Sequence, residues 1–269
     1  MDRILLGDNL ALLRELADGC VQMAYADPPF NTGRTQTRRT LATVASENGD
    51  RTGFGGRRYA SELLESSSYR DAFDDYLGFL EPRLRELHRV LHPTGTLYLH
   101  LDYREAHHVK LLLDEVFGGP RSFLNELIWA YDYGGKPKRR WPQKHDTILV
   151  YVKDPGAYFF DGEAVEREPY MAPGLVSPER AARGKMPVSV IWHTIVSPTG
   201  REKTGYPTQK PEGLVRRFVH ASSRPGDLCL DPFAGSGTLG AVAAAAGRRY
   251  LLMDESPDAV RVMRARLPA

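Results

Sequence analysis

Short apolar runs alternate with helix-like apolar spacing along most of the chain. A short apolar run at residues 4–6 is followed by a helix-like segment through Leu10, Leu13 and Leu16, and then by a second apolar run at 21–26. This alternation is typical of an α/β protein whose mostly parallel sheet is covered by helices on both faces. Further strands are expected at 96–101, 123–129, 147–152, 228–230 and 250–253, and further helices at 69–91, 104–117, 211–222, after Gly237 and from Pro257.

Two stretches lack this regularity. Residues 31–67 are rich in Gly, Thr, Ser and Arg with little periodicity, which predicts a long, partly mobile loop. Residues 154–205 are rich in Pro, Gly and charge and contain one apolar piece near 188–192, so we interpret them as an accessory region.

Composition places the chain among globular proteins with a sizeable core. It has 269 residues, of which 42% are hydrophobic and 26% charged, enough for one large α/β domain or two small ones. The N-terminus lacks a signal-peptide pattern and no segment approaches the roughly 20 apolar residues of a membrane span, so a soluble, cytoplasmic protein is expected. Cys20 and Cys229 lack a Cys or His partner at metal-ligand spacing, so neither a metal nor a disulfide is expected.

The distribution of charge is more informative than its total. A formal net charge of +2 does not indicate a nucleic-acid partner by itself. A solvated surface is an equally good interpretation of basic clusters when nothing else points to a polyanion. The densest clusters are Arg34, Arg38 and Arg39, and then Lys136, Lys138, Arg139 and Arg140, which precede Trp141.

A strand, a small-residue turn and a helix start lie between Asp227 and Thr238. The glycines of this turn allow close backbone approach to a ligand, and the helix start offers free N–H groups. Alone, such a turn is more often a sign of tight packing. Asp254 strengthens the ligand interpretation because an acid at the next strand end can bind both ribose hydroxyls, although it could instead cap the following helix, a role open also to Ser256. The turn suits neither a pyrophosphate nor a P-loop, and S-adenosyl-L-methionine is the predicted cofactor.

A second motif, Asp27-Pro28-Pro29-Phe30, ends the strand at 21–26. One carboxylate and the Pro28 carbonyl could together accept both N–H bonds of an amino group on a flipped base, with Phe30 stacked on that base. Such hydrogen bonds favour a tetrahedral nitrogen that attacks a sulfonium methyl group directly. On its own, however, Asp-Pro-Pro is more often an ordinary turn.

Together these motifs closely resemble the DNA amino-methyltransferases of bacterial restriction-modification systems, in the class β order with the catalytic motif first. The segment from Tyr206 to Pro211, together with Leu6 to Asn9, also resembles that family. The resemblance implies a Rossmann-like methyltransferase fold with a seven-stranded, mostly parallel sheet in a single domain over 1–269. It further implies a DNA-facing loop at 31–67, a target-recognition region at 154–205, double-stranded DNA as substrate, self-association as a homodimer, and a cognate restriction endonuclease as partner.

The resemblance also assigns residues. The catalytic group is Asp27, Pro28, Pro29 and Phe30, and DNA phosphate contacts are expected from the two basic clusters, with Trp141 or Tyr133 filling the gap left by the flipped base. Lys210 could otherwise be a surface ion-pair partner. The expected cofactor-binding residues are Asp8, Asn9, Thr208, Lys210, Asp231, Phe233, Ala234, Gly235, Ser236, Gly237, Thr238 and Asp254.

The target atom stays open at this point. Asp27 resembles the adenine-N6 form of the motif, whereas Ser in that place is commoner among cytosine-N4 enzymes. An RNA methyltransferase, a protein-amide methyltransferase and a DNA-binding relic without cofactor are the competing hypotheses. Protein-amide enzymes usually have Asn first in the motif, and the intact Asp231, Gly235 and Asp254 argue against a relic.

Overall fold

The computed structural model describes residues 3–31, 34–45, 51–52, 58–71 and 73–267, and the side chains of 3–31 and 73–267. The chain divides into two compact units. One comprises Met1–Pro28 and Asp75–Ala269, and the other is Pro29–Asp74.

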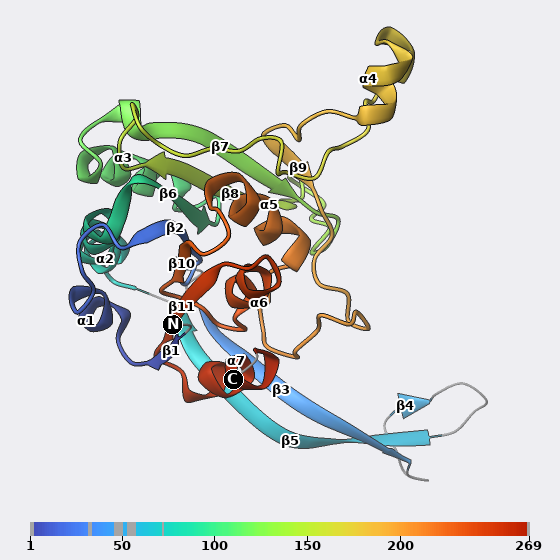
Figure 1. Cartoon of the computed structure of the whole chain (residues 1–269). Coiled ribbons are helices and arrows are strands. Elements are labelled where there is room, and N and C mark those ends of the chain that lie inside the picture. Colours follow the sequence, from blue (N-terminus) through green and yellow to red (C-terminus); the bar gives the residue numbers. More distant parts are fainter. Residues whose placement is uncertain (1–2, 32–33, 46–50, 53–57, 72, 268–269) are drawn as a thin grey trace. The chain divides into compact units, whose positions relative to one another are not determined.

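The larger unit is built on one mostly parallel sheet. The order β1-β11-β10-β2-β6-β8-β7-β9 places strands from both ends of the chain side by side, and among the described residues β8 alone runs against its neighbours (Figure 1). In that order the strands are Arg3–Leu6, Arg249–Asp254, Leu228–Asp231, Val21–Ala26, Leu91–Leu101, His145–Val152, Phe123–Ala130 and Val190–Trp192.

The expected number of strands was wrong, because the sheet has eight strands instead of seven. The additional strand is β9, which pairs in parallel with β7 through Ile128 and Val190. Its three residues lie in the apolar piece at 188–192, which is too short to show a strand pattern without the pairing partner.

Helices cover both faces of the sheet (Figure 1). One face carries α5 (Glu212–Ser222), α6 (Thr238–Ala245) and α7 (Pro257–Arg266). On the other are α1 (Asn9–Arg14), α2 (Tyr76–Val90) and α3 (Ala106–Val116). The helix expected from residue 69 begins instead at Tyr76, where Asp75 accepts a hydrogen bond from Gly78 N at 2.8 Å. Short helical pieces are Pro120–Ser122 (η2), Pro173–Leu175 (η3) and α4 (Pro178–Arg183).

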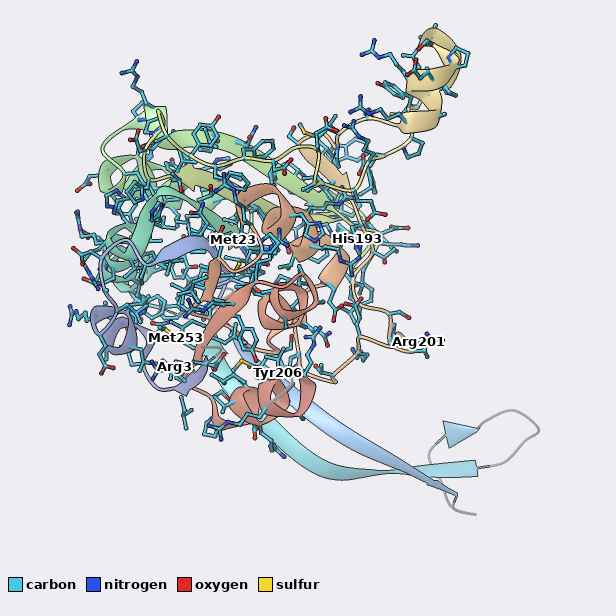
Figure 2. The ribbon with its side chains drawn as sticks, in the orientation of Figure 1. Arg3, Met23, His193, Arg201, Tyr206 and Met253 are labelled. Carbon is cyan, nitrogen blue, oxygen red and sulfur yellow. The ribbon has the colours of Figure 1, made fainter. Side chains whose placement is uncertain are left out.

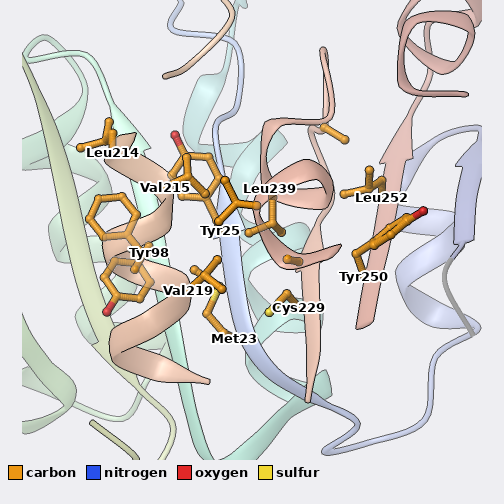
Figure 3. Packing of buried hydrophobic residues seen from close by; sticks show 14 of the residues in the cluster. Met23, Tyr25, Tyr98, Leu214, Val215, Val219, Cys229, Leu239, Tyr250 and Leu252 are labelled. Carbon is orange, nitrogen blue, oxygen red and sulfur yellow. The ribbon is translucent and has the colours of Figure 1, made fainter. Parts of the chain in front are cut away.

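The main hydrophobic core lies between the sheet and the α5–α6 pair. Met23 and Tyr25 of β2 and Tyr98 of β6 pack there against Val219 of α5 and Leu239 of α6 (Figure 3). Every residue of β2 is buried, as expected for a central strand with helices on both faces. The core therefore holds firmly the strand that leads into the Asp27 motif.

The smaller unit is an antiparallel pairing of β3 (Arg34–Ala45) with β5 (Arg58–Asp71), to which β4 (Arg51–Thr52) is added. The prediction of a loop at 31–67 was therefore wrong for most of this stretch. Thr is common in this stretch and suits strands, but the stretch lacks the alternation of apolar and polar residues by which a strand is predicted from sequence. Asn31 Oδ1 accepts a hydrogen bond from Phe73 N at 3.0 Å, which ties together the two ends of the unit.

The first part of residues 154–205 packs back onto the larger unit. Asp161 N donates to Ala221 O at 2.8 Å, and Arg217 of α5 forms an ion pair with Glu168 at 2.6 Å. Farther along, α4 projects with exposed flanking residues, including Met171 and Leu175 (Figure 1). In the described residues, every helix is too short or too polar to cross a bilayer.

Candidate functional site

Four aspartates lie at the carboxyl ends of four neighbouring parallel strands. Asp254 ends β11 and Asp231 ends β10, while Asp27 directly follows β2 and Asp8 follows β1 by two residues. Because neighbouring strands are about 4.8 Å apart, the four positions span roughly 15 Å along one edge of the sheet. The carboxyl edge of a parallel sheet is where ligands bind in open α/β folds.

Asp231 is buried at the start of the small-residue turn. Its Oδ1 accepts a hydrogen bond from Phe233 N at 3.0 Å, and 3% of the residue is exposed. Burial raises the pKa of Asp231 well above its ordinary value, and the nearby carboxylates of Asp27 and Asp254 raise it further. The Asp231 carboxyl group therefore stabilises the turn through its hydrogen bond, but its ionised form is unfavourable at this buried position.

The turn itself needs its glycines. Gly235 and Gly237 have φ of +49° and +72°, in the left-handed region that side chains rarely adopt. The turn is held by Asp254, whose Oδ2 accepts from Gly235 N and whose Oδ1 accepts from Ser256 N, each at 2.8 Å. Burial raises the pKa of Asp254. Ser256, not Asp254, caps α7 with its side chain, so the capping alternative for Asp254 was wrong.

Two of the expected cofactor residues have side chains committed to the protein. Thr238 Oγ1 donates to Lys210 O at 3.0 Å, and Arg266 NH1 lies 3.0 Å from Ser236 O and 3.2 Å from Thr238 Oγ1. Arg266 also forms an ion pair with Glu212 at 2.6 Å. Ser236 Oγ is also 3.2 Å from Thr238 Oγ1, so both side chains stabilise the turn, and Arg266 is a supporting residue that no sequence pattern indicated.

The catalytic motif meets the Tyr206–Pro211 segment through an ion pair. Lys210 Nζ donates to Asp27 Oδ2 at 2.5 Å, and the two side chains are 9% and 17% exposed. The alternative of a surface ion pair was therefore wrong for Lys210. Asp27 Oδ1 is buried and has no hydrogen-bond partner within the described part of the chain. One carboxylate oxygen is thus fixed by a cation while the other is available to a hydrogen-bond donor.

The segment that carries Lys210 is folded tightly. Gln209 is buried and accepts from Thr204 N at 2.9 Å while it donates to Glu202 O at 2.6 Å. Thr208 has a positive φ of 56°, which is uncommon for a residue other than Gly. Tyr206, labelled in Figure 2, lies so close to Gly235 that a Cβ there would be 3.1 Å from its ring. Through Tyr206 and through Lys210, whose carbonyl accepts from Thr238, this segment packs beside the glycine turn, and the cofactor-binding roles of Thr208 and Lys210 stay predictions.

The opposite end of the edge is organised by Arg83, which the sequence did not indicate. Its guanidinium donates to Asp8 Oδ2 and to Asn9 Oδ1, each at 2.7 Å, and lies 3.9 Å from the centre of the Phe79 ring. Asn9 in turn donates to Pro232 O at 2.7 Å. Phe79 and Phe233 have ring centres 6.3 Å apart. Asp8 and Asn9 thus connect the end of β1 to the glycine turn, beside an aromatic pair.

The remaining residues of the catalytic motif are divided between the two units. Pro28 is buried in the larger unit, whereas Pro29 and Phe30 belong to the smaller one. Stacking of Phe30 on a base therefore stays a prediction. Arg34, Arg38 and Arg39 fall on β3, where side chains lie outside the described residues.

The second basic cluster forms an exposed loop between β7 and β8. Lys136, Lys138, Arg139 and Arg140 are all exposed, and Trp141 and Tyr133 are 92% and 66% exposed. Because β7 ends and β8 begins at this loop, the loop lies on the same edge of the sheet as Asp27. This loop, which we call the basic loop, therefore presents its positive charge on the edge of the sheet that carries Asp27.

Comparison with known proteins identifies the family. A family model described as DNA methylase, for the N6 and N4 amino-methyltransferases, matches residues 21–265. The chain belongs to this family. The resemblance inferred from the motifs is confirmed.

Individual similarities agree with the family. The chain is 31% identical to the DNA adenine methyltransferase YhdJ of Escherichia coli K12 over 272 residues, covering 98% of this chain and 82% of YhdJ. Two solved structures share the fold. The cytosine-N4-specific PvuII DNA methyltransferase has a TM-score of 0.68 and 16% identity, and the match covers 100% of this chain and 87% of that one. The complex of M1.HpyAVI with S-adenosylmethionine has a TM-score of 0.63 and 19% identity, and the match covers both chains fully. The expected methyltransferase fold is confirmed, and S-adenosylmethionine is the cofactor of this family.

The buried Asp231 carboxyl predicts a pH-dependent gain in stability for Asp231→Asn. A raised folded-state pKa means that the wild type loses unfolding free energy as the pH rises above the ordinary pKa near 4, because ionisation is easier in the unfolded chain. The variant lacks this loss, and its amide oxygen can still accept from Phe233 N. Urea unfolding at pH 5 and pH 8 should give an advantage of the variant that grows with pH, by about 1.4 kcal/mol per pH unit separating the two pKa values. A constant difference would contradict this account.

The Lys210–Asp27 pair predicts a strong coupling in stability. Lys210→Met leaves a buried carboxylate without its cation, so the free energy of unfolding should fall by about 3 kcal/mol. Asp27→Asn combined with Lys210→Met should recover much of this loss, because the buried charge is then gone. Urea unfolding of the two single variants and the double variant measures the coupling. Additive losses would mean that the ion pair contributes little.

Proposed function

We propose that this protein transfers a methyl group from S-adenosylmethionine to the exocyclic amino group of adenine, at N6, in double-stranded DNA. The observation that carries the proposal is the state of the Asp27 carboxylate. Its Oδ2 is fixed by Lys210, while its buried Oδ1 has no hydrogen-bond partner in the described residues. A buried acceptor of this kind matches a target that carries an N–H donor.

Asp27 acts on the amino nitrogen. An N–H bond directed at Asp27 Oδ1 draws electron density towards the nitrogen and favours its lone pair as nucleophile. When bound, S-adenosylmethionine supplies an electrophilic methyl group on a sulfonium. The nitrogen would form a bond to that carbon as the carbon–sulfur bond breaks, S-adenosylhomocysteine would leave, and one N–H proton would pass to Asp27 Oδ1, which accepts its hydrogen bond. The Lys210 ammonium holds the Asp27 carboxylate in position through their ion pair.

The length of the sheet edge that carries the four aspartates supports binding of the cofactor along it. The row of four aspartates is roughly 15 Å long, which suits an extended nucleoside with an amino-acid tail. Asp254 would bind the ribose, the turn from Phe233 to Gly237 would approach the methionine part, and the Asp8 end would lie near the adenine. The buried carboxylates of Asp231 and Asp254 favour a ligand with positive charge near them.

Adenine is preferred over cytosine on two grounds. Asp27 resembles the adenine form of the motif, and YhdJ, at 31% identity, is named an adenine methyltransferase. The PvuII enzyme, named as cytosine-N4-specific, is 16% identical and supports the fold alone. Cytosine N4 is the alternative, because the same hydrogen bond from an amino group to Asp27 would serve either base.

DNA would be held on the catalytic edge. The loop of Lys136, Lys138, Arg139 and Arg140 provides exposed positive charge for phosphates, and the exposed Trp141 could fill the gap left by a flipped base. Residues 154–205 would contribute to target recognition. A homodimer and a partner endonuclease are further proposals, which rest on the family resemblance.

The product test is direct. The purified protein with S-adenosylmethionine and bacterial genomic DNA lacking methylation should produce N6-methyladenine, identified by mass spectrometry after digestion to nucleosides. Asp27→Ala should lower the rate by about a hundredfold or more, because it removes the acceptor for the amino group, while calorimetry should still detect cofactor binding. N4-methylcytosine as product would replace adenine by cytosine in the proposal, and methylation of RNA alone would refute it.

Phosphate contacts predict a change in salt dependence. Lys138→Ala with Arg139→Ala should weaken binding to DNA of any sequence and reduce the slope of log affinity against log salt by about 2, or roughly 1 for each lost contact. Fluorescence anisotropy between 50 and 200 mM salt, about the range over which such contacts are screened, measures this slope. A variant that bound as tightly as the wild type but chose different sequences would assign these side chains to base reading.

A further inference from the structure

A chain of hydrogen bonds runs across strands β2, β6 and β8 to the residue that follows β7. Tyr131 OH donates to Asp146 Oδ1 at 3.0 Å, and His100 Nε2 is 3.0 Å from Asp146 Oδ2. The other ring nitrogen of His100 is 2.8 Å from Tyr25 OH. Because a carboxylate can accept but not donate, His100 Nε2 is the donor to Asp146. We refer to Tyr25, His100, Asp146 and Tyr131 as the cross-sheet chain.

The two ends of the cross-sheet chain reach the two functional parts of the edge. Tyr25 lies on β2, two residues before Asp27 and therefore on the same side of the strand. Asp146 lies near the start of β8 and Tyr131 directly follows β7, so they form the two stems of the basic loop. Tyr131 N also donates to Lys144 O at 3.0 Å, which closes the loop at its base.

The packing around the cross-sheet chain leaves little freedom of movement. His100 is completely buried, and the edge of its ring meets Trp129 at 5.6 Å between centres. Trp129 is anchored by a hydrogen bond from Nε1 to His193 O at 2.7 Å. Tyr25 stacks on Phe218, with ring centres 6.1 Å apart. A buried polar network with all these groups paired is rigid and specific in geometry.

Charge keeps the chain in one protonation state at Tyr25. Burial raises the pKa of Tyr25 well above its ordinary value, and the carboxylates of Asp27, Asp231 and Asp146 raise it further. The phenol therefore stays neutral and remains a hydrogen-bond donor.

We propose that the cross-sheet chain couples the basic loop to Asp27 by holding the stems of the loop in a fixed position relative to the carboxylate, so that DNA seated on the loop presents its target amino group to Asp27. Tyr25, His100 and Asp146 are thus positioning residues. The proposal rests on the proposed function, because it assumes that the loop binds DNA. Physically, a rigid element between two sites fixes their relative geometry, and the rate of a reaction between positioned groups depends strongly on that geometry.

A pair of tyrosines provides a matched test. Tyr25 and Tyr98 are register partners on β2 and β6, both stack on Phe218, and Tyr98 OH is hydrogen-bonded at 2.7 Å to Ser222, which lies outside the cross-sheet chain. Tyr25→Phe and Tyr98→Phe each remove one buried hydrogen bond. Only Tyr25→Phe should lower kcat on bacterial genomic DNA, by about tenfold, with the affinity for S-adenosylmethionine unchanged. Asp146→Asn, at the other end of the chain, should show the same loss, and urea unfolding confirms that each variant is folded.

A double-mutant cycle then tests the coupling itself. In the wild-type background, Lys138→Ala with Arg139→Ala should raise KM for DNA and lower kcat. In the Tyr25→Phe background, the same two substitutions should raise KM for DNA but leave kcat unchanged. Equal kcat values for Tyr25→Phe and Tyr98→Phe, or losses in kcat that simply add, would overturn the coupling while leaving the methyltransferase proposal intact. A wild-type protein that methylates no DNA would refute the proposed function and this inference with it.

Discussion

Parallel pairing of four strands is the constraint on which the site depends. β1, β11, β10 and β2 come from opposite ends of the chain, yet their carboxyl ends share one edge because each strand runs in the same direction as its neighbour. The order of motifs along the sequence therefore matters little to the chemistry. What matters is that the glycine turn after β10 and the Asp27 motif after β2 belong to adjacent strands, so that the proposed positions of the methyl donor and of the target base are one strand spacing apart.

The same arrangement concentrates negative charge, and the structure offsets that charge locally. Asp231 and Asp254 are held by backbone N–H groups of the turn, whereas Asp27 is held by Lys210. Hydrogen bonds from N–H groups and one buried cation reduce the repulsion, but the pKa values of Asp231 and Asp254 remain raised. A cationic ligand would lower this cost. Such a preference for positive charge would be a form of electrostatic preorganisation, which favours catalysis.

How far the sequence could predict this site depends on whether each residue acts locally or across the fold. The Asp231–Thr238 turn and the Asp27 motif could be predicted because their chemistry is contained in a few consecutive residues. Arg83, Arg266 and His100 could not, because each acts through partners far away in the sequence, and an isolated Arg or His has many uses. The strands β3 and β5 were missed for a related reason: their pairing is between two segments of one hairpin, without the apolar alternation that a buried face imposes.

Lys210 shows how the two halves of the site act as one. Its side chain holds Asp27, and its backbone carbonyl accepts a hydrogen bond from Thr238 at the start of α6. The position of the catalytic carboxylate is therefore tied, through a single buried residue, to the helix that begins at the glycine turn. Gln209 and Tyr206 fix the neighbouring segment, so Lys210 has little freedom to move independently. A ligand that orders the glycine turn would thereby also order the carboxylate, which links occupation of the cofactor site to readiness for the target amino group.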